Sequence, residues 1–268
     1  MTSRLKSTSA AISEGPMTPG PLLLICEHAS CAFPPEFGDL GLDDDVRRSH
    51  VAWDPGALAL TRYLGDALGA PLVAGNVSRL LYDCNRPPEA PDATPAKSEV
   101  FDIPGNVGLD DAARKERADS IYHPFSAAVE NAIAQVDPAA IVTIHSFTPV
   151  YFGAQRAVEI GVLHDADTRL ADALLAALPG TPPQVDRNQP YGPEHGVTHT
   201  LKRHALPANR LNVMLEVRND LIADDAGVER IGALLAPALK QALAETGQGA
   251  ASICAAMAAL GASSAVVS

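Results

Sequence analysis

The sequence has little positive charge. Lys and Arg together number 20 against 32 Asp and Glu, which gives a formal net charge of −12 and a pI near 5.0. Binding to phosphate backbones or anionic lipid needs a surplus of basic side chains. We therefore expect no nucleic-acid partner and no membrane partner. Any cations that bind an anionic ligand must be concentrated in one pocket.

Cysteine is also scarce. The four cysteines, Cys26, Cys31, Cys84 and Cys254, have irregular spacing and form no Cys-x-x-Cys pair. This pattern excludes a disulfide framework and argues against a structural zinc site. Free thiols are typical of a reducing compartment, so we expect a cytoplasmic location.

Long apolar runs are missing from both ends of the chain. Residues 1–20 are polar and rich in Ser, Thr and Pro, which predicts a flexible leader and not a signal peptide. Residues 249–268 are apolar, but Ala, Ser and Gly give little driving force for a membrane span. We expect a tail or loosely packed terminal helix there, after one domain over residues 21–248.

Within that domain, short apolar runs alternate with longer amphipathic ones. This pattern is typical of a single α/β domain with a mainly parallel sheet flanked by helices. Two stretches, 87–111 and 184–207, are rich in Pro, Gly, Asn and Asp and resemble functional loops or lids. We expect strands at 22–26, 71–74, 77–82, 141–144, 158–163 and 213–217, and helices at 54–68, 112–136 (restarted or kinked at Pro124), 167–178 and 225–246.

Polar side chains stand at the ends of three expected strands. His28 follows the first strand, His145 follows the strand at 141–144, and Glu216 lies in the strand at 213–217. Ligands of open α/β sheets bind beyond the carboxyl ends of strands, and two histidines with a carboxylate suit a catalytic zinc. Each histidine taken alone is more typical of a structural residue than of a metal ligand. Glu216 is either paired with an arginine such as Arg218 or functional, because an unpaired buried carboxylate is costly.

The segment from Ser78 to Pro88 suggests anion binding. Arg79 and Arg86 bracket a short apolar run, and Asn85 adds an amide donor. An arginine can hold a carboxylate through two hydrogen bonds or stabilise a developing oxyanion. The alternative is two ordinary surface arginines.

Three further residues have open assignments. Asp54 precedes Pro55 and is either the N-cap of the helix at 54–68 or an acidic metal ligand. His195 and His199, in the long loop at 184–207, either contact substrate or merely cover the site.

Taken in order, these segments resemble the N-formylglutamate amidohydrolase family. The resemblance is carried by residues 27–30, 53–54, 78–79, 83–88, 122–125, 144–146, 188–196 and 215–216, and it spans residues 21 to about 239. It implies a mixed sheet flanked by helices, similar to zinc carboxypeptidases and aspartoacylases. It also implies one divalent metal, zinc above all although cobalt and manganese suit the same ligands, and a small anionic acylamino acid as substrate.

The resemblance also implies roles for particular residues. His28 and His145 match the metal-binding histidines, and Glu216 matches the glutamate that activates the attacking water and then protonates the leaving amine. Asp54 would supply the acidic ligand, since Cys31 occupies the position where the carboxypeptidase pattern has an acid. Glu27 is a competing ligand.

Arg79 matches the arginine that polarises the substrate carbonyl, whereas Asn85 and Arg86 match the pair that holds the substrate carboxylate. His195 and His199 are further candidates for substrate contact. Glu27 stands where the strict N-formylglutamate enzymes usually have proline, which indicates a divergent branch whose substrate need not be N-formylglutamate itself.

Two enzyme activities and one binding function are therefore compatible with the sequence. The first is hydrolysis of N-formylglutamate or a related N-acyl amino acid. The second is a carboxypeptidase or deacylase activity on another acylamino acid or a small peptide, and the third is a non-catalytic relative that binds metal or ligand. A serine hydrolase is disfavoured because the chain has no Gly-x-Ser-x-Gly elbow.

Overall fold

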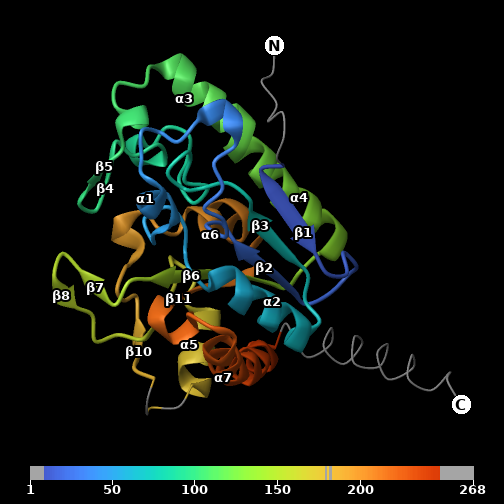
Figure 1. The fold of residues 1–268 in the computed structure, drawn as a ribbon. Coiled ribbons are helices and arrows are strands. Elements are labelled where there is room, and N and C mark those ends of the chain that lie inside the picture. Colours follow the sequence, from blue (N-terminus) through green and yellow to red (C-terminus); the bar gives the residue numbers. More distant parts are fainter. Residues whose placement is uncertain (1–8, 179, 181–182, 248–268) are drawn as a thin grey trace, which may run out of the picture.

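The computed structural model describes residues 9–178, 180 and 183–247, and a seven-stranded sheet lies at its centre (Figure 1). The three middle strands are β2 (Leu22–Cys26), β6 (Ala140–Phe147) and β11 (Leu211–Arg218), and all three are parallel. They are buried along almost their whole length because helices cover both faces. Double-sided burial explains why these sequences are continuously apolar and do not alternate.

The outer strands make the sheet mixed. On one side β3 (Leu72–Gly75) is parallel to β2, and β1 (Ala11–Glu14) is antiparallel to β3. On the other side β9 (Ile160–Leu163) is antiparallel to β11, and β10 (Val185–Arg187) is parallel to β9. Four of the six pairings are parallel, so the predicted α/β fold with a mixed, mainly parallel sheet is confirmed.

Helices form a layer on each face of the sheet (Figure 1). On one face α2 (Ala57–Leu68), α5 (Arg169–Ala177) and α7 (Asp225–Glu245) share a hydrophobic core with alternate residues of the central strands. On the other face α4 (His123–Val136) packs on the opposite residues of β2, β3 and β6, and α6 (His199–His204) packs beside β11. The two cores together fix the sheet between the layers.

Two sequence-based boundaries are wrong. Residues 77–82 form a turn and not a strand, because Ser78 accepts a hydrogen bond from the backbone N–H of Leu80 and donates one to the carbonyl of Ala52. The expected flexible leader contains β1, whose backbone satisfies the outer edge of β3. Residues 1–8 and the expected tail at 249–268 lie outside the described residues.

The helical stretch predicted at 112–136 is divided, as expected, and a new α-helix begins at His123, next to Pro124. α3 (Asp111–Arg117) passes through a single π-turn into α4, whose second residue is Pro124. The predicted loop at 184–207 is more ordered than expected, since it contains β10 and α6.

The predicted loop at 87–111 carries a small hairpin of β4 (Lys97–Ser98) and β5 (Phe101–Asp102). A second hairpin, β7 (Val150–Tyr151) and β8 (Ala154–Gln155), follows β6. Both hairpins project on the same side of the molecule, on the left in Figure 1. The short helix α1 (Asp44–Arg48) lies between β2 and α2 in the chain. Within the described ranges, no helix has the length and apolarity needed to cross a bilayer.

Candidate active site

The candidate site lies at the carboxyl edge of the three middle strands. His28 comes two residues after β2, His145 lies near the end of β6, and Glu216 on β11 is in register with His145. Since β2, β6 and β11 are adjacent and parallel, these positions meet at one edge of the sheet. All three side chains are buried.

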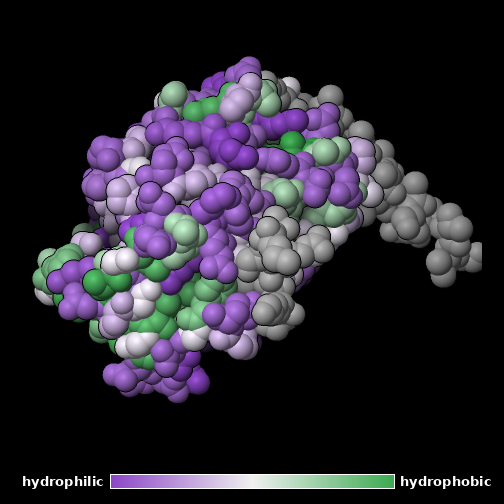
Figure 2. Space-filling view, turned by 90° about the horizontal axis from the view of Figure 1, so that it is seen from above, coloured by the Kyte–Doolittle hydropathy of each residue, from purple (hydrophilic) through white to green (hydrophobic). Residues whose placement is uncertain are grey.

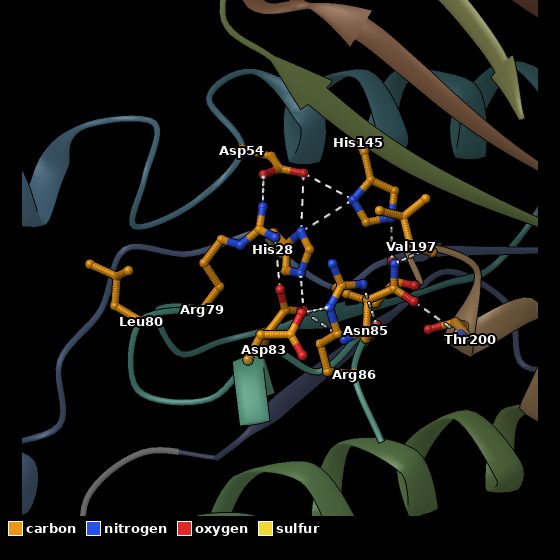
Figure 3. Close-up of polar contacts among 12 residues, drawn as sticks. His28, Asp54, Arg79, Leu80, Asp83, Asn85, Arg86, His145, Val197 and Thr200 are labelled. Carbon is orange, nitrogen blue, oxygen red and sulfur yellow. Dashed lines mark hydrogen bonds and ion pairs between the residues drawn. The ribbon is translucent and has the colours of Figure 1, made fainter. Parts of the chain in front are cut away.

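Three ligand atoms converge there (Figure 3). Nδ1 of His28 and Nδ1 of His145 are 3.2 Å apart, and Oδ2 of Asp54 lies 3.3 Å from the first and 2.9 Å from the second. Neighbouring ligands of a tetrahedral zinc with bonds of about 2.0 Å are separated by about 3.3 Å. The spacing of the three donor atoms therefore fits a divalent metal.

Asp54 takes part as a ligand candidate and not as a helix cap. Helix α2 begins at Ala57, and Gly56, with φ 80°, is its N-cap residue. A side chain at residue 56 would meet the carbonyl oxygen of Ile222 at 2.3 Å from its Cβ, so the turn requires glycine. The backbone N–H of Asp54 donates to the carbonyl of His28 (2.9 Å), which holds its carboxylate beside the two imidazoles.

A second carboxylate meets the far side of each imidazole ring. Nε2 of His28 lies 2.6 Å from Oδ1 of Asp83, and Nε2 of His145 lies 3.0 Å from Oε2 of Glu27. Such partners fix the tautomer and orientation of metal-binding histidines. The contact between His28 and Asp83 has hydrogen-bond geometry, whereas that between His145 and Glu27 is an ion pair by distance. Glu27 thus lies behind His145, outside the group formed by His28, Asp54 and His145, which makes Asp54 the better placed acid for a metal.

The charges of this cluster also favour a cation. Arg79 bridges two acids, with Nη1 3.2 Å from Oδ1 of Asp54 and Nη2 2.7 Å from Oδ2 of Asp83. Burial opposes ionisation of both carboxyl groups, yet His28 and Arg79 lower the pKa of Asp54 and of Asp83 overall. Burial lowers the pKa of both imidazoles, but the neighbouring carboxylates raise it overall, so without a metal the protonated rings balance these acids. A bound metal takes the place of those protons, and the three carboxylates of Glu27, Asp54 and Asp83 then exceed the single guanidinium by two charges. A divalent cation would neutralise that excess.

Glu216 is a buried carboxyl group with a raised pKa. Burial raises the pKa of its carboxyl group to about 7, although His145 opposes the rise. Its Oε2 atom is buried and has no hydrogen-bond partner among the described residues. Arg218 does not pair with it, because that guanidinium contacts Glu159 and Asp220. Glu216 is therefore an unpaired carboxyl group that faces the cavity.

The cavity above these residues has a volume of about 380 Å³. Of the predicted substrate contacts, Asn85, Arg86 and His195 line it, as does Arg79, whereas His199 is not part of the lining. His199 instead lies 2.8 Å from the hydroxyl of Tyr122.

Asn85 and Arg86 are tied to the far loop. The side-chain amide of Asn85 donates to the carbonyl of Val197, and its oxygen accepts from the N–H of Thr200 (Figure 3). Arg86 donates to Asp92 and to the carbonyl of Gly196. Both side chains therefore fasten residues 196–200 to the rim of the cavity.

Sequence reasoning assigned no role to Asp83 or Tyr191. Asp83 follows Arg79 by four residues, a spacing that the ion pair uses, but the pattern alone did not reveal its contact with His28. Tyr191 lines the cavity, and its surroundings include the charges of Glu216 and Arg156. Only the three-dimensional arrangement assembles these groups.

Comparison with known proteins agrees with this architecture. Residues 20–223 match the sequence model of the N-formylglutamate amidohydrolase family. A solved gene product of Agrobacterium tumefaciens is 52% identical over 89% of this chain and 96% of its own, with a TM-score of 0.85. The solved N-formylglutamate amidohydrolase of Ralstonia eutropha is 18% identical over 87% of this chain and 96% of its own, with a TM-score of 0.61, which shows a shared fold. No curated protein matches the chain.

Proposed function

Because the chain belongs to the N-formylglutamate amidohydrolase family, we propose that it hydrolyses the amide of N-formyl-L-glutamate or a closely related N-acyl amino acid, with one divalent metal. One observation carries the proposal: the unpaired carboxyl group of Glu216 shares a cavity with the converging ligand atoms of His28, Asp54 and His145. We propose zinc as the metal, since two imidazoles and one carboxylate are a common catalytic zinc set that leaves a position open.

The chain's own residues would hold the metal and keep it in place. His28 and His145 would bind through Nδ1, and Asp54 through Oδ2, while Asp83 and Glu27 keep the two rings oriented. When bound, the metal supplies Lewis acidity that polarises the amide carbonyl and makes water more acidic.

Glu216 carries the proton transfers. It accepts a proton from the attacking water as the water oxygen bonds to the carbonyl carbon. The protonated carboxyl group then delivers that proton to the amide nitrogen as the C–N bond breaks, which releases formate and the free amino acid. A pKa near 7 suits both steps, because the group gains and loses a proton easily at neutral pH.

Three other residues are assigned to the substrate. Arg79 lines the cavity beside the ligand carboxylate and places positive charge where the carbonyl oxygen becomes negative. Arg86 binds a carboxylate of the substrate, and Asn85 positions Arg86 by holding the neighbouring loop. His195 stands at the cavity wall, where it can contact the same end of the substrate.

We also propose that the protein works in the cytoplasm. The three cysteines within the described residues, Cys26, Cys31 and Cys84, are free thiols, which suits a reducing compartment.

The direct test measures formate and glutamate released from N-formyl-L-glutamate by purified protein supplied with zinc. Stoichiometric release of both products supports the proposal. N-Acetyl-L-glutamate serves as the matched substrate with one extra methyl group. Hydrolysis of the acetyl compound alone would move the assignment to another deacylase, and hydrolysis of neither would favour a non-catalytic binding protein.

A further inference from the structure

One arginine, which is not itself part of the cavity lining, is held between aromatic rings of the cavity wall. Arg156 follows strand β8, and its backbone N–H donates to the carbonyl of Pro149 (2.8 Å), which closes the β7–β8 hairpin onto the end of β6. The centre of its guanidinium lies 4.4 Å from the ring centroid of Tyr151, 4.9 Å from that of Tyr191 and 5.4 Å from that of Phe147. All three rings line the cavity.

The polar partners of this guanidinium are neutral. Nη2 donates to the hydroxyl of Tyr191 (3.0 Å), and Nη1 has only a long contact of 3.5 Å to the carbonyl of Thr148. Among the residues with described positions, no carboxylate lies within ion-pair distance of Arg156, whereas Arg79 and Arg86 each have at least one acidic partner. The chain has a net charge of −12, yet the guanidinium of Arg156 has no acidic partner among the described residues.

The surroundings strengthen an ion pair at this position. Aromatic rings against a guanidinium hold its plane and leave its edge for hydrogen bonds in that plane, the geometry that a carboxylate accepts. The hairpin tip adds Tyr151 and Phe152, whose rings contact each other with centroids 4.6 Å apart. Apolar surface gathers at the left edge of Figure 2, the side on which both the β4–β5 and the β7–β8 hairpins project in Figure 1. The rings of Phe147, Tyr151 and Tyr191 replace water around the guanidinium, which lowers the local dielectric there.

We propose that Arg156 is a specificity-determining residue that binds the side-chain carboxylate of a dicarboxylic acylamino acid. The inference rests on the proposed function and deepens it, because it names the residue that recognises the second carboxylate of the substrate. Arg86, which also forms an ion pair with Asp92, binds the other carboxylate of the substrate. The two arginines then select for two anionic groups, and a substrate with a neutral side chain leaves Arg156 unpaired.

The experiment measures binding in the absence of turnover. Calorimetry on zinc-loaded protein in a Glu216→Gln background compares N-formyl-L-glutamate with N-formyl-L-glutamine, which has nearly the same shape and no side-chain charge. We expect the glutamate compound to bind at least about 10-fold more tightly, in line with a charge-assisted bidentate pair. Arg156→Met should reduce that preference to less than about 3-fold and leave the affinity for the glutamine compound nearly unchanged. Arg156→Lys should restore part of the preference.

Arg187→Met is the matched control, because Arg187 pairs with Asp172 and contacts His164, and neither partner lines the cavity. This control should change neither affinity. Equal loss of both ligands in Arg156→Met would assign Arg156 a purely structural role beside Tyr191 and overturn the proposal. An unchanged preference, or no binding of either ligand while Arg156 is intact, would also overturn it.

The same variants separate this inference from the proposed function. If the protein with intact Glu216 releases no formate but binding retains an Arg156-dependent preference for the diacid, the proposed activity fails and the role of Arg156 stands. If formate is released and the preference ignores Arg156, the activity stands and the role of Arg156 fails.

Discussion

Nε2 of His145 lies 3.0 Å from Oε2 of Glu27, on the side of the imidazole that faces away from Asp54. Glu27 immediately precedes the other histidine of the group, so one dipeptide supplies both a ligand candidate and the carboxylate behind the second ligand. The backbone carbonyl oxygen of Glu27 lies against Gly75 of β3. A Cβ atom at residue 75 would be 2.0 Å from that oxygen. The glycine in β3 therefore permits the close approach that places Glu27.

This arrangement predicts different effects for the acids around the metal. Asp54→Asn should abolish tight zinc binding, because the variant loses a charged ligand atom. Glu27→Gln and Asp83→Asn should each weaken binding by about 10- to 100-fold, since they act only through the histidines. Competition with a zinc-binding dye gives the affinities. Equal losses in Asp54→Asn and Glu27→Gln would contradict the assignment of Asp54 as the ligand.

Glu216→Gln tests the general base. The substitution keeps the shape of the side chain and leaves the three ligand atoms intact, so zinc content and the unfolding midpoint should stay close to those of the parent protein. The turnover number for N-formyl-L-glutamate should fall by about 10²- to 10⁴-fold. Retention of most of the activity would remove Glu216 from the proton-transfer steps.

Arg86→Ala tests the carboxylate contact. Its main effect should be a rise in KM for N-formyl-L-glutamate of about 10-fold or more, because a charge-assisted hydrogen bond contributes about 1.5–3 kcal/mol. Arg86→Lys should retain part of the affinity. Steady-state kinetics on both variants give the answer, and a KM equal to that of the parent protein would exclude Arg86 from substrate binding.

The lowered pKa of His204 predicts that the protein loses stability in acid. Burial, with the neighbouring charge of Arg203, lowers its pKa to about 4 from an ordinary value of 6.5. Between these values the unfolded chain binds the proton and the folded chain does not, so stability falls as the pH drops from 6.5 toward 4. His204→Gln should remove about 1–2 kcal/mol of that loss between pH 6.5 and 4.5.

Urea unfolding at several pH values measures the effect of His204 on the free energy of unfolding. His123→Gln is the matched control, because His123 is on the neighbouring helix α4 and its side chain is 54% exposed. Parallel pH profiles for the parent protein and His204→Gln would contradict the prediction.

The fold and the centre of the site could be predicted because they follow from strand order. Apolar runs in the sequence indicated the strands β2, β6 and β11. Because these strands are parallel neighbours, the polar residues at their carboxyl ends meet at one edge of the sheet. The sequence left Asp54 ambiguous, since a cap and a ligand use the same residue type. The glycine N-cap, two residues later, resolved the ambiguity only in three dimensions.

Other features depend on contacts between distant segments. Ser78 converts an apolar stretch into a turn through a hydrogen bond to Ala52, 26 residues earlier. The rings around Arg156 come from β6, β7 and the loop before α6, and no local pattern predicts their meeting. Such arrangements arise from tertiary packing, which overrides local propensity.

The central claim is that His28, Asp54 and His145 form the metal centre of a hydrolase. The most direct test is the metal content of the purified protein, combined with formate release from N-formyl-L-glutamate before chelation, after chelation and after zinc is restored. We predict about one zinc per chain, loss of hydrolysis on chelation, and recovery on addition of zinc. A protein that binds no zinc after reconstitution, or that hydrolyses the substrate equally well with the metal removed, would contradict the account.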